Sequence, residues 1–246
     1  MITSLRFRLA AWLDRKEAQI RRVGERVGWP QGWLQEWIEY SQEPRLPLEE
    51  FYVLYTLKRQ KAQKHIRAVK TEADALAFYR DSDYMLWRNL VHRRHSAWRR
   101  VLVTMRIKNG GLVEVGCGIA PISTWVVRRK PRWHCLLRDV HGSPHYKYAL
   151  WRMKRLTGHH VQDMGQAQVV CLIDVLEHVS DPLKLSRQWV DFLAPGGYLH
   201  WNFVGNPRRN DLDLATPEQR DKTVRYLYDA LDLVWEGEGY RVSRKR

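Results

Sequence analysis

Residues 110–121, GGLVEVGCGIAP, combine residue types that could bind a cofactor. An apolar run leads into a turn in which Glu114 precedes Gly116 by two positions and Cys117 separates Gly116 from Gly118. Glycine has no Cβ, so ligand atoms can approach the backbone of such a turn closely. Pro121 suits the first turn of a helix. A strand, a glycine turn and a helix in this order predict a nucleotide-type cofactor loop at the end of a strand.

Further carboxylates follow apolar runs that read as strands. Asp139 ends the run 132–140, Asp163 lies in an expected short strand at 159–164, and Asp174 ends the apolar part of 167–176. In a parallel sheet, ligands bind beyond the carboxyl ends of the strands. His178 follows Asp174 at the mouth of this expected site, and histidine titrates near neutral pH.

The elements that must position these residues alternate from residue 110 onward, which favours a mainly parallel, doubly wound α/β sheet. After the strand at 110–115, we expect further strands at 132–140, 159–164, 167–176 and 197–205, helices at 121–130, 144–156, 181–193 and 216–231, and a closing hairpin at 232–244. Helices are expected earlier, at 1–28, 32–41, 48–70 and 71–106, the last interrupted near 81–83. We therefore expect a helical extension at 1–74 and one α/β domain at 75–246.

Two motifs at this spacing resemble the class I S-adenosylmethionine-dependent methyltransferases. They are EVGCG at 114–118 and LEHVSDPLKLSRQWVDFLAPGGYL at 176–199, similar to the branch that includes small-molecule and quinone-biosynthesis enzymes. The resemblance covers about residues 75–246. It implies a Rossmann-like fold with a seven-stranded sheet, and S-adenosylmethionine as cofactor. The loop departs from the family pattern at Ala120, and the span from Asp163 to Val169 is short.

The resemblance also implies roles for individual residues. Glu114 and the turn Gly116, Cys117 and Gly118 would line the methionine part of the cofactor, and Asp139 would accept hydrogen bonds from the ribose hydroxyls. Asp163 would lie near the adenine amine, and Asp174 beside the transferable methyl group. The alternatives are a structural carboxylate at Glu114, a strand cap at Asp139, a surface position for Asp163, and a backbone contribution alone from Asp174.

Methyl transfer from a sulfonium is an in-line displacement, in which the protein chiefly aligns the reacting atoms. His178 is the candidate catalytic base if the acceptor must lose a proton; the alternative is a structural histidine. A divalent ion could also bind to Asp174, Glu177 and His178. Three possible ligands within five residues allow a metal site but do not indicate one, so we predict no metal site.

The acceptor pocket is expected to involve the helix within 79–100, where Tyr84 and Arg88 are i,i+4 neighbours and His95 follows two turns later. These residues would present positive charge to an anionic small-molecule acceptor. The alternative is a packing stripe with solvated arginines. The loop 206–211 is a second candidate rim, or an ordinary polar loop.

The formal net charge of +15 favours anionic partners. Twelve tryptophans beside basic residues would suit base stacking, but their helical spacing among apolar residues indicates a core, so a small molecule ranks above nucleic acid. Residues 1–28 form a basic amphipathic pattern, which makes peripheral membrane contact and a lipid acceptor an alternative. A non-catalytic cofactor-binding partner is a further alternative. The sequence does not indicate an oligomeric state.

Three widely spaced cysteines, Cys117, Cys135 and Cys171, indicate neither a disulfide framework nor a zinc site. No apolar run is long enough to span a membrane, and the first residues lack the pattern of a signal peptide. These features predict a cytoplasmic protein.

Overall fold

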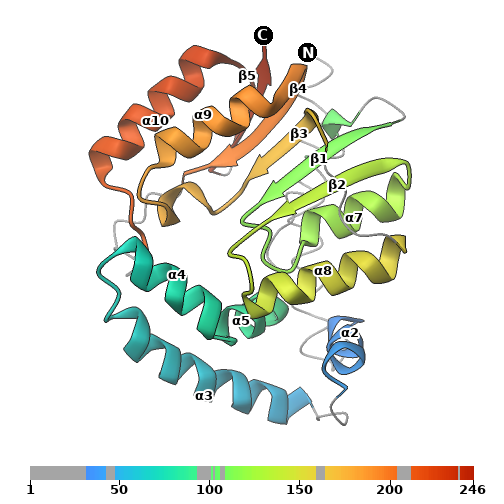
Figure 1. The fold of residues 1–246 in the computed structure, drawn as a ribbon, viewed down its shortest axis with the longest axis vertical. Helices are drawn as coiled ribbons and strands as arrows, with labels where there is room; N and C mark the ends of the chain where they lie inside the picture. Colours follow the sequence, from blue (N-terminus) through green and yellow to red (C-terminus); the bar gives the residue numbers. More distant parts are fainter. Residues whose placement is uncertain are drawn as a thin grey trace.

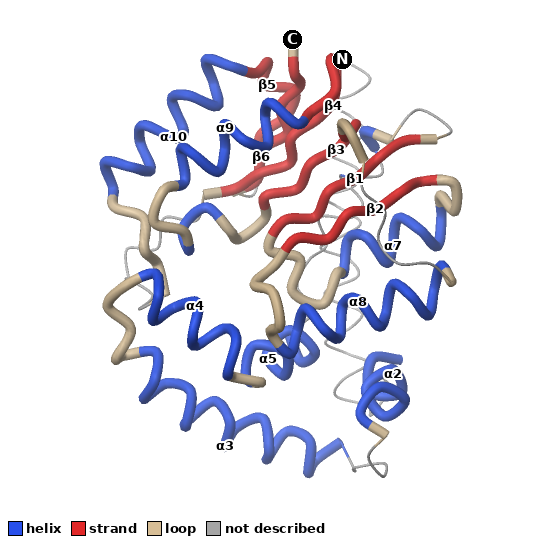
Figure 2. The backbone as a smooth tube through the Cα atoms, viewed as in Figure 1, coloured by secondary structure: helices blue, strands red, loops and turns tan. Residues whose placement is uncertain are grey.

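The computed structural model describes residues 32–42, 48–92, 101, 103–105, 109–158, 164–203, 212–237 and 239–246. A central twisted sheet has helices on both faces, and further helices lie beyond one end of its strands (Figures 1 and 2). The expected helix at 1–28, with its membrane-contact hypothesis, lies outside the described residues.

The described residues form one six-stranded sheet in the order β2-β1-β3-β4-β6-β5. The first four strands are parallel, and β6 pairs antiparallel with both β4 and β5, which confirms the closing hairpin. The strands are β1 Gly110–Val115, β2 Trp133–Arg138, β3 Ala167–Leu172, β4 Leu193–Asn202, β5 Leu231–Gly237 and β6 Tyr240–Lys245. The mainly parallel α/β class is thus confirmed. The seven-stranded count is not, since the strand expected at 159–164 falls almost entirely outside the described residues.

Alternation along the strands assigns the two faces of the sheet. Leu112 of β1 packs with residues of α7 (Pro121–Arg129) and α8 (Pro144–Thr157). Val113, the next residue, packs on the other face with residues of α9 (Pro182–Phe192) and α10 (Pro217–Ala230). Leu112 and Val113 are both fully buried. The domain therefore has a hydrophobic core on each face of the sheet, between the sheet and a layer of helices (Figure 1).

These four helices all begin with proline, whose fixed φ and missing N–H suit the first helical position. Side chains cap three of them: Ser143 accepts from the amide of Tyr146, Asp181 from Lys184, and Thr216 from Gln219. The sequence therefore fixes the starts of the helices locally, and each start lies in a connection after a strand.

The N-terminal helices form a third hydrophobic cluster. They are α2 Gly32–Ser41, α3 Leu48–Ile66, α4 Glu72–Asp81 and α5 Tyr84–His92, and the expected interruption near 81–83 is confirmed. Tyr148 of α8 belongs to the same cluster, and Arg152 of α8 lies 2.9 Å from Glu36 of α2. Aromatic packing and an ion pair thus hold the N-terminal helices against α8 of the sheet domain. The proposed boundary at residue 74 stays a prediction, and it lies inside α4.

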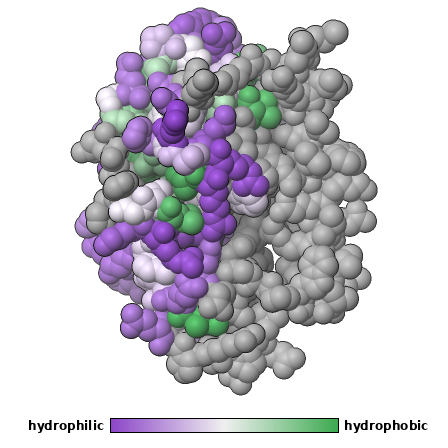
Figure 3. All heavy atoms as spheres, turned by 90° about the vertical axis from the view of Figure 1, so that its right-hand side faces the viewer, coloured by the Kyte–Doolittle hydropathy of each residue, from purple (hydrophilic) through white to green (hydrophobic). Residues whose placement is uncertain are grey.

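Burial agrees with the core interpretation of the tryptophans. Six tryptophans of the described part of the chain are largely buried: Trp37, Trp87, Trp133, Trp189, Trp201 and Trp235. The three cysteines are buried and free. No described helix has the length and apolar character needed to cross a membrane. On the face shown in Figure 3, the described residues are mainly hydrophilic, with small separate hydrophobic patches.

Candidate functional site

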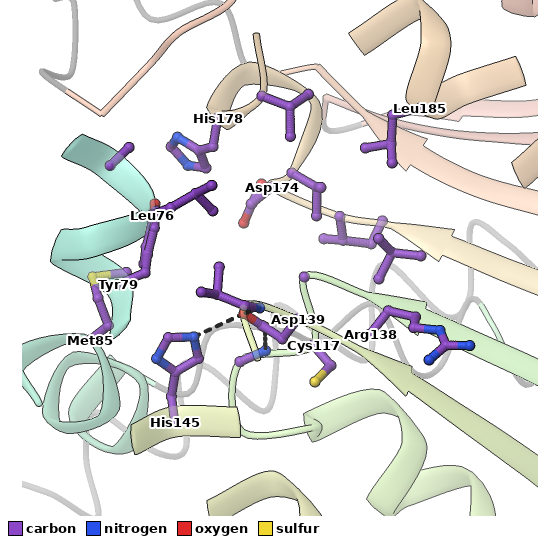
Figure 4. Close-up of a pocket in the computed structure, with 18 of the residues that line it drawn as sticks. Leu76, Tyr79, Met85, Cys117, Arg138, Asp139, His145, Asp174, His178 and Leu185 are labelled. Carbon is purple, nitrogen blue, oxygen red and sulfur yellow. Dashed lines mark hydrogen bonds and ion pairs between the residues drawn. The ribbon is translucent and has the colours of Figure 1, made fainter. Parts of the chain in front are cut away.

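A cavity of about 710 Å³ lies at the carboxyl ends of β1, β2 and β3. Helices α4 and α5 lie beyond these strand ends (Figure 1), and side chains from both helices line the cavity together with α9. The volume is in the range of small-molecule and cofactor sites. Figure 4 shows Leu76 and Tyr79 of α4 pointing toward the space that Asp139 and Asp174 also face.

The glycine turn forms part of the cavity wall. Gly116 and Gly118 have φ of +59° and +55°, a region that favours glycine. A Cβ on Gly116 would lie 2.5 Å from Val175 Cγ2, and one on Gly118 would lie 2.8 Å from Asn89 Nδ2. Gly116, Cys117 and Gly118 all line the cavity. The turn therefore needs glycine both for its conformation and for its space, and it presents backbone to a ligand.

Asp139 lies beside this turn, directly after β2. One carboxylate oxygen, Oδ2, accepts from the Gly118 amide at 2.7 Å. The other, Oδ1, lies 2.7 Å from the Val140 amide and 2.9 Å from Nε2 of His145. The Cys117 thiol also lies within hydrogen-bonding reach of this carboxylate. His145 Nδ1 is buried and has no hydrogen-bond partner among the described residues. Backbone amides and side chains thus hold the Asp139 carboxylate beside the glycine turn.

Glu114 occupies a different place from the cavity wall. Its carboxylate accepts from the amides of Ile122, at 3.2 Å, and Ser123, at 2.7 Å, in the first turn of α7. These are amides that have no intrahelical partner. Burial raises the pKa of Glu114 to about 7, although these hydrogen bonds and the charge of Arg152 act in the opposite direction. Glu114 is not among the residues that line the cavity, so it supports the turn from beneath.

Asp174 lies at the cavity just after β3 and has a φ of +54°. Its amide donates to Asn202 Oδ1 at 2.6 Å, and the amide nitrogen of Asn202 donates back to the Asp174 carboxylate. Asn202 is buried on β4. The neighbouring strand therefore holds Asp174 in an uncommon backbone conformation, which is a feature that often marks functional sites.

His178 lines the cavity from a short 3-10 helix, Leu176–His178. Its Nδ1 lies 3.2 Å from Asp213 Oδ1 and 3.2 Å from the Leu212 carbonyl oxygen. Burial lowers the pKa of His178, but the Asp213 hydrogen bond and the charges of Glu177 and Asp213 outweigh it and raise the pKa overall. A base with this environment accepts a proton readily.

Comparison with known proteins identifies the family. A family profile described as a methyltransferase domain matches residues 90–240, more than half of the chain. The chain belongs to this family. It is an S-adenosylmethionine-dependent methyltransferase, as the two motifs indicated. A search of curated proteins found no match.

Solved structures show the same fold at low identity. An O-methyltransferase family protein from Burkholderia thailandensis is 16% identical, with a TM-score of 0.54 over 80% of this chain and 70% of that one. Magnesium protoporphyrin IX methyltransferase from Synechocystis PCC 6803, solved with bound S-adenosylmethionine, is 11% identical, with a TM-score of 0.53 over 72% of this chain and 98% of that one.

The cavity of the methyltransferase fits its cofactor. S-adenosylmethionine has ribose hydroxyls that need acceptors, and the carboxylate of Asp139 is an acceptor that lines the cavity. The backbone of Gly116 and Gly118 faces the cavity where added side chains would collide with Val175 and Asn89. The predicted roles of Glu114 at the methionine part and of Asp174 beside the methyl group stay predictions.

The residues predicted from sequence to bind the methyl acceptor lie in different places in the structure. Arg88 of α5 lines the main cavity. Tyr84 does not: it is buried at the start of α5, stacks on Tyr55 of α3 with ring centroids 6.1 Å apart, and lines a second cavity of about 480 Å³. Tyr84 is therefore corrected to a packing residue. His95 and Asp163 lie outside the described residues, as does the candidate rim 206–211.

Other residues at the site were missed by the sequence reasoning. Leu76 and Tyr79 share a face of α4, but an apolar helix face alone does not reveal what it covers. Asn202 and Asp213 lie far from their partners in sequence, and no local pattern signals such contacts. In the part of the chain that the structure describes, no three histidine, cysteine or acidic side chains are grouped to hold a metal ion.

Proposed function

We propose that the methyltransferase transfers a methyl group from S-adenosylmethionine to a small anionic acceptor seated between the strand ends and helices α4 and α5. The cofactor supplies an activated methyl group on a sulfonium. The observation that supports this most strongly is one cavity with Asp139 and the glycine turn on one side and His178 on the other.

Asp139 and the turn hold the cofactor side in this proposal. The Gly118 amide and His145 fix the Asp139 carboxylate, and this carboxylate accepts from a ribose hydroxyl. The turn backbone, supported from beneath by Glu114, lies where the methionine part of the cofactor would bind.

Arg88 holds the acceptor side. It is half-buried on the cavity wall, and no carboxylate of the described residues pairs with it. Its charge lies close enough to Tyr79 to lower the pKa of that phenol, although burial raises the pKa overall. A guanidinium that has no carboxylate partner among the described residues, in a partly enclosed site, favours a carboxylate or phosphate on the ligand.

Apolar and aromatic side chains complete the acceptor side. Leu76, Tyr79 and Met85 come from α4 and α5, and Leu214 comes from the segment after β4. An organic acceptor with an apolar body and an acidic group fits these surfaces. The Synechocystis neighbour, named for a porphyrin acceptor, is in keeping with a small-molecule acceptor.

The test uses methyl-labelled S-adenosylmethionine, the full chain and a cell extract, with the products separated into lipid, aqueous small-molecule, nucleic-acid and protein fractions. Label in the aqueous small-molecule fraction that binds an anion exchanger supports the proposal. Label confined to the lipid, nucleic-acid or protein fraction would overturn the acceptor class.

A further inference from the structure

The segment after β4 is tied to the 3-10 helix that bears His178. The amides of Leu214 and Ala215 donate to the Glu177 carbonyl oxygen at 2.9 and 3.2 Å. In return, the His178 ring bonds to Leu212 and Asp213 of the same segment. Contacts in both directions hold the imidazole against one fixed set of partners.

These partners decide which ring nitrogen bears the proton. Both atoms near His178 Nδ1, the Leu212 carbonyl oxygen and Asp213 Oδ1, are acceptors. Nδ1 must therefore be the donor, and a neutral imidazole with hydrogen on Nδ1 has an acceptor at Nε2. Nε2 has no hydrogen-bond partner in the described part of the chain, and the side chain is 22% exposed where it lines the cavity.

We propose that Asp213 is a positioning residue that holds His178 with Nε2 available to the acceptor, and that the acceptor reacts through a hydroxyl oxygen. This inference rests on the proposed function. As the oxygen–carbon bond forms, the carbon–sulfur bond breaks, its electron pair stays on sulfur, and the hydroxyl proton passes to Nε2 of His178. The products are a methyl ether, a neutral thioether and an imidazolium paired with Asp213.

A hydroxyl accounts for an acceptor at Nε2 better than a neutral amine does, because an amine can attack through its lone pair before it loses a proton. A hydroxyl stays neutral until transfer, and its proton needs an acceptor at that moment. Asp213 then stabilises the imidazolium that forms, as a carboxylate oriented on a catalytic histidine does.

Several charged groups share this region, so the role of Asp213 must be separated from theirs. Glu177 and Asp213 raise the pKa of His178 directly, and burial opposes them. Glu72, Tyr79, Arg88 and Asp174 line the same cavity.

Nuclear magnetic resonance on the full chain tests the tautomer without any acceptor. The experiment records long-range proton–nitrogen spectra of the chain with nitrogen-15-labelled histidine. The His178 signals are assigned by their loss in His178→Gln. At a pH where the ring is neutral, they should show the proton on Nδ1. In Asp213→Asn the amide oxygen can still accept from Nδ1, so the tautomer should persist while the titration midpoint moves to lower pH. Asp232→Asn, which removes an exposed carboxylate paired with Arg246, is the matched control and should leave the midpoint unchanged.

A neutral ring protonated on Nε2, or the same midpoint in Asp213→Asn as in the Asp232→Asn control, would overturn the positioning role. The hydroxyl part is tested with the labelled extract. His178→Gln should lose about 100-fold or more of the transfer rate and keep S-adenosylhomocysteine binding, and the product should be an alkali-stable methyl ether.

Failure of the two proposals can be told apart. Label transferred by His178→Gln at the wild-type rate, or label released by alkali as from a methyl ester, contradicts the hydroxyl inference alone. A wild-type chain that neither binds S-adenosylhomocysteine nor transfers label contradicts the proposed function.

Discussion

His145 Nε2 lies 2.9 Å from Oδ1 of Asp139, and both side chains are buried at the end of β2. Ser143 caps α8 and also lies 3.2 Å from the same imidazole nitrogen. The start of the helix therefore fixes the histidine, and the histidine fixes the carboxylate beside the glycine turn. Asp139 and His145, six residues apart in sequence, thus form one hydrogen-bonded unit at the proposed cofactor side of the cavity.

Asp139→Ala should weaken S-adenosylhomocysteine binding by about tenfold to a hundredfold, because a charge-assisted hydrogen bond contributes about 1.5–3 kcal/mol. His145→Phe, which keeps the carboxylate but removes its orienting bond, should weaken binding by less. Calorimetry on the folded variants measures both affinities, with Asp232→Ala as control. Equal affinity in Asp139→Ala and the wild type would remove Asp139 from the cofactor site.

Arg88→Ala should affect the acceptor and leave the cofactor alone. Loss of a charged hydrogen bond predicts about a tenfold or greater fall in labelled transfer at low acceptor concentration. S-adenosylhomocysteine affinity should change by less than about twofold, since Arg88 is assigned to the opposite side of the cavity. Arg59→Ala on the exposed face of α3 is the matched control. A parallel loss of cofactor affinity in Arg88→Ala would place this guanidinium at the cofactor instead.

Glu114 makes a prediction about stability and pH. Its folded pKa of about 7 lies above the ordinary value of 4.5, so between these values the folded state binds more protons than the unfolded state. Stability from this group is therefore present at low pH and is lost as pH rises from about 4.5 to 7, by up to about 3 kcal/mol.

Glu114→Gln stays neutral and should lack this decline, although it leaves the amide of Ile122 or Ser123 without a carboxylate partner. Urea unfolding of both proteins across this pH range measures the difference. A constant gap between wild type and variant would show that Glu114 does not titrate in this range.

Alanine substitutions at Gly116 and Gly142 distinguish two causes of lost stability, the strained backbone conformation and the steric clash of an added Cβ. Both have positive φ, +59° and +80°, but a Cβ on Gly142 meets nothing within 4 Å, whereas one on Gly116 reaches Val175. Gly142→Ala should lose about 1 kcal/mol of stability from conformation alone. Gly116→Ala should lose about 1–3 kcal/mol more from overpacking. Denaturant unfolding of the two variants compares them, and equal losses would contradict the tight approach of Val175 to the turn.

The sequence predicted the elements whose signals are local. Apolar runs, their alternation with helical segments and the proline at residue 121 placed β1 to β4 and α7 to α10, and the break at Ser82 between α4 and α5 was also anticipated. The same local signals placed Gly116, Gly118, Asp139, Asp174 and His178 around one cavity, because strand ends of a parallel sheet meet at one edge.

Contacts between segments that are distant in sequence could not be predicted from these local signals. Helical spacing put Tyr84 and Arg88 on one face, yet Tyr84 packs on Tyr55 of α3, whose position depends on the whole helical region. Asn202 meets Asp174 because β4 lies next to β3, and Asp213 meets His178 because the chain returns after β4. The carboxylate of Glu114 accepts from the amides of Ile122 and Ser123 in the first turn of α7, a contact that the motif alone does not reveal.

Labelled methyl transfer by the wild type and by Asp139→Ala, read together with S-adenosylhomocysteine calorimetry, tests the central claim most directly. The account predicts that the wild-type chain binds S-adenosylhomocysteine and labels an aqueous, anionic small molecule. Asp139→Ala should remain folded, bind S-adenosylhomocysteine about tenfold to a hundredfold more weakly, and transfer correspondingly less label. Wild-type protein that neither binds S-adenosylhomocysteine nor labels any fraction would contradict the account.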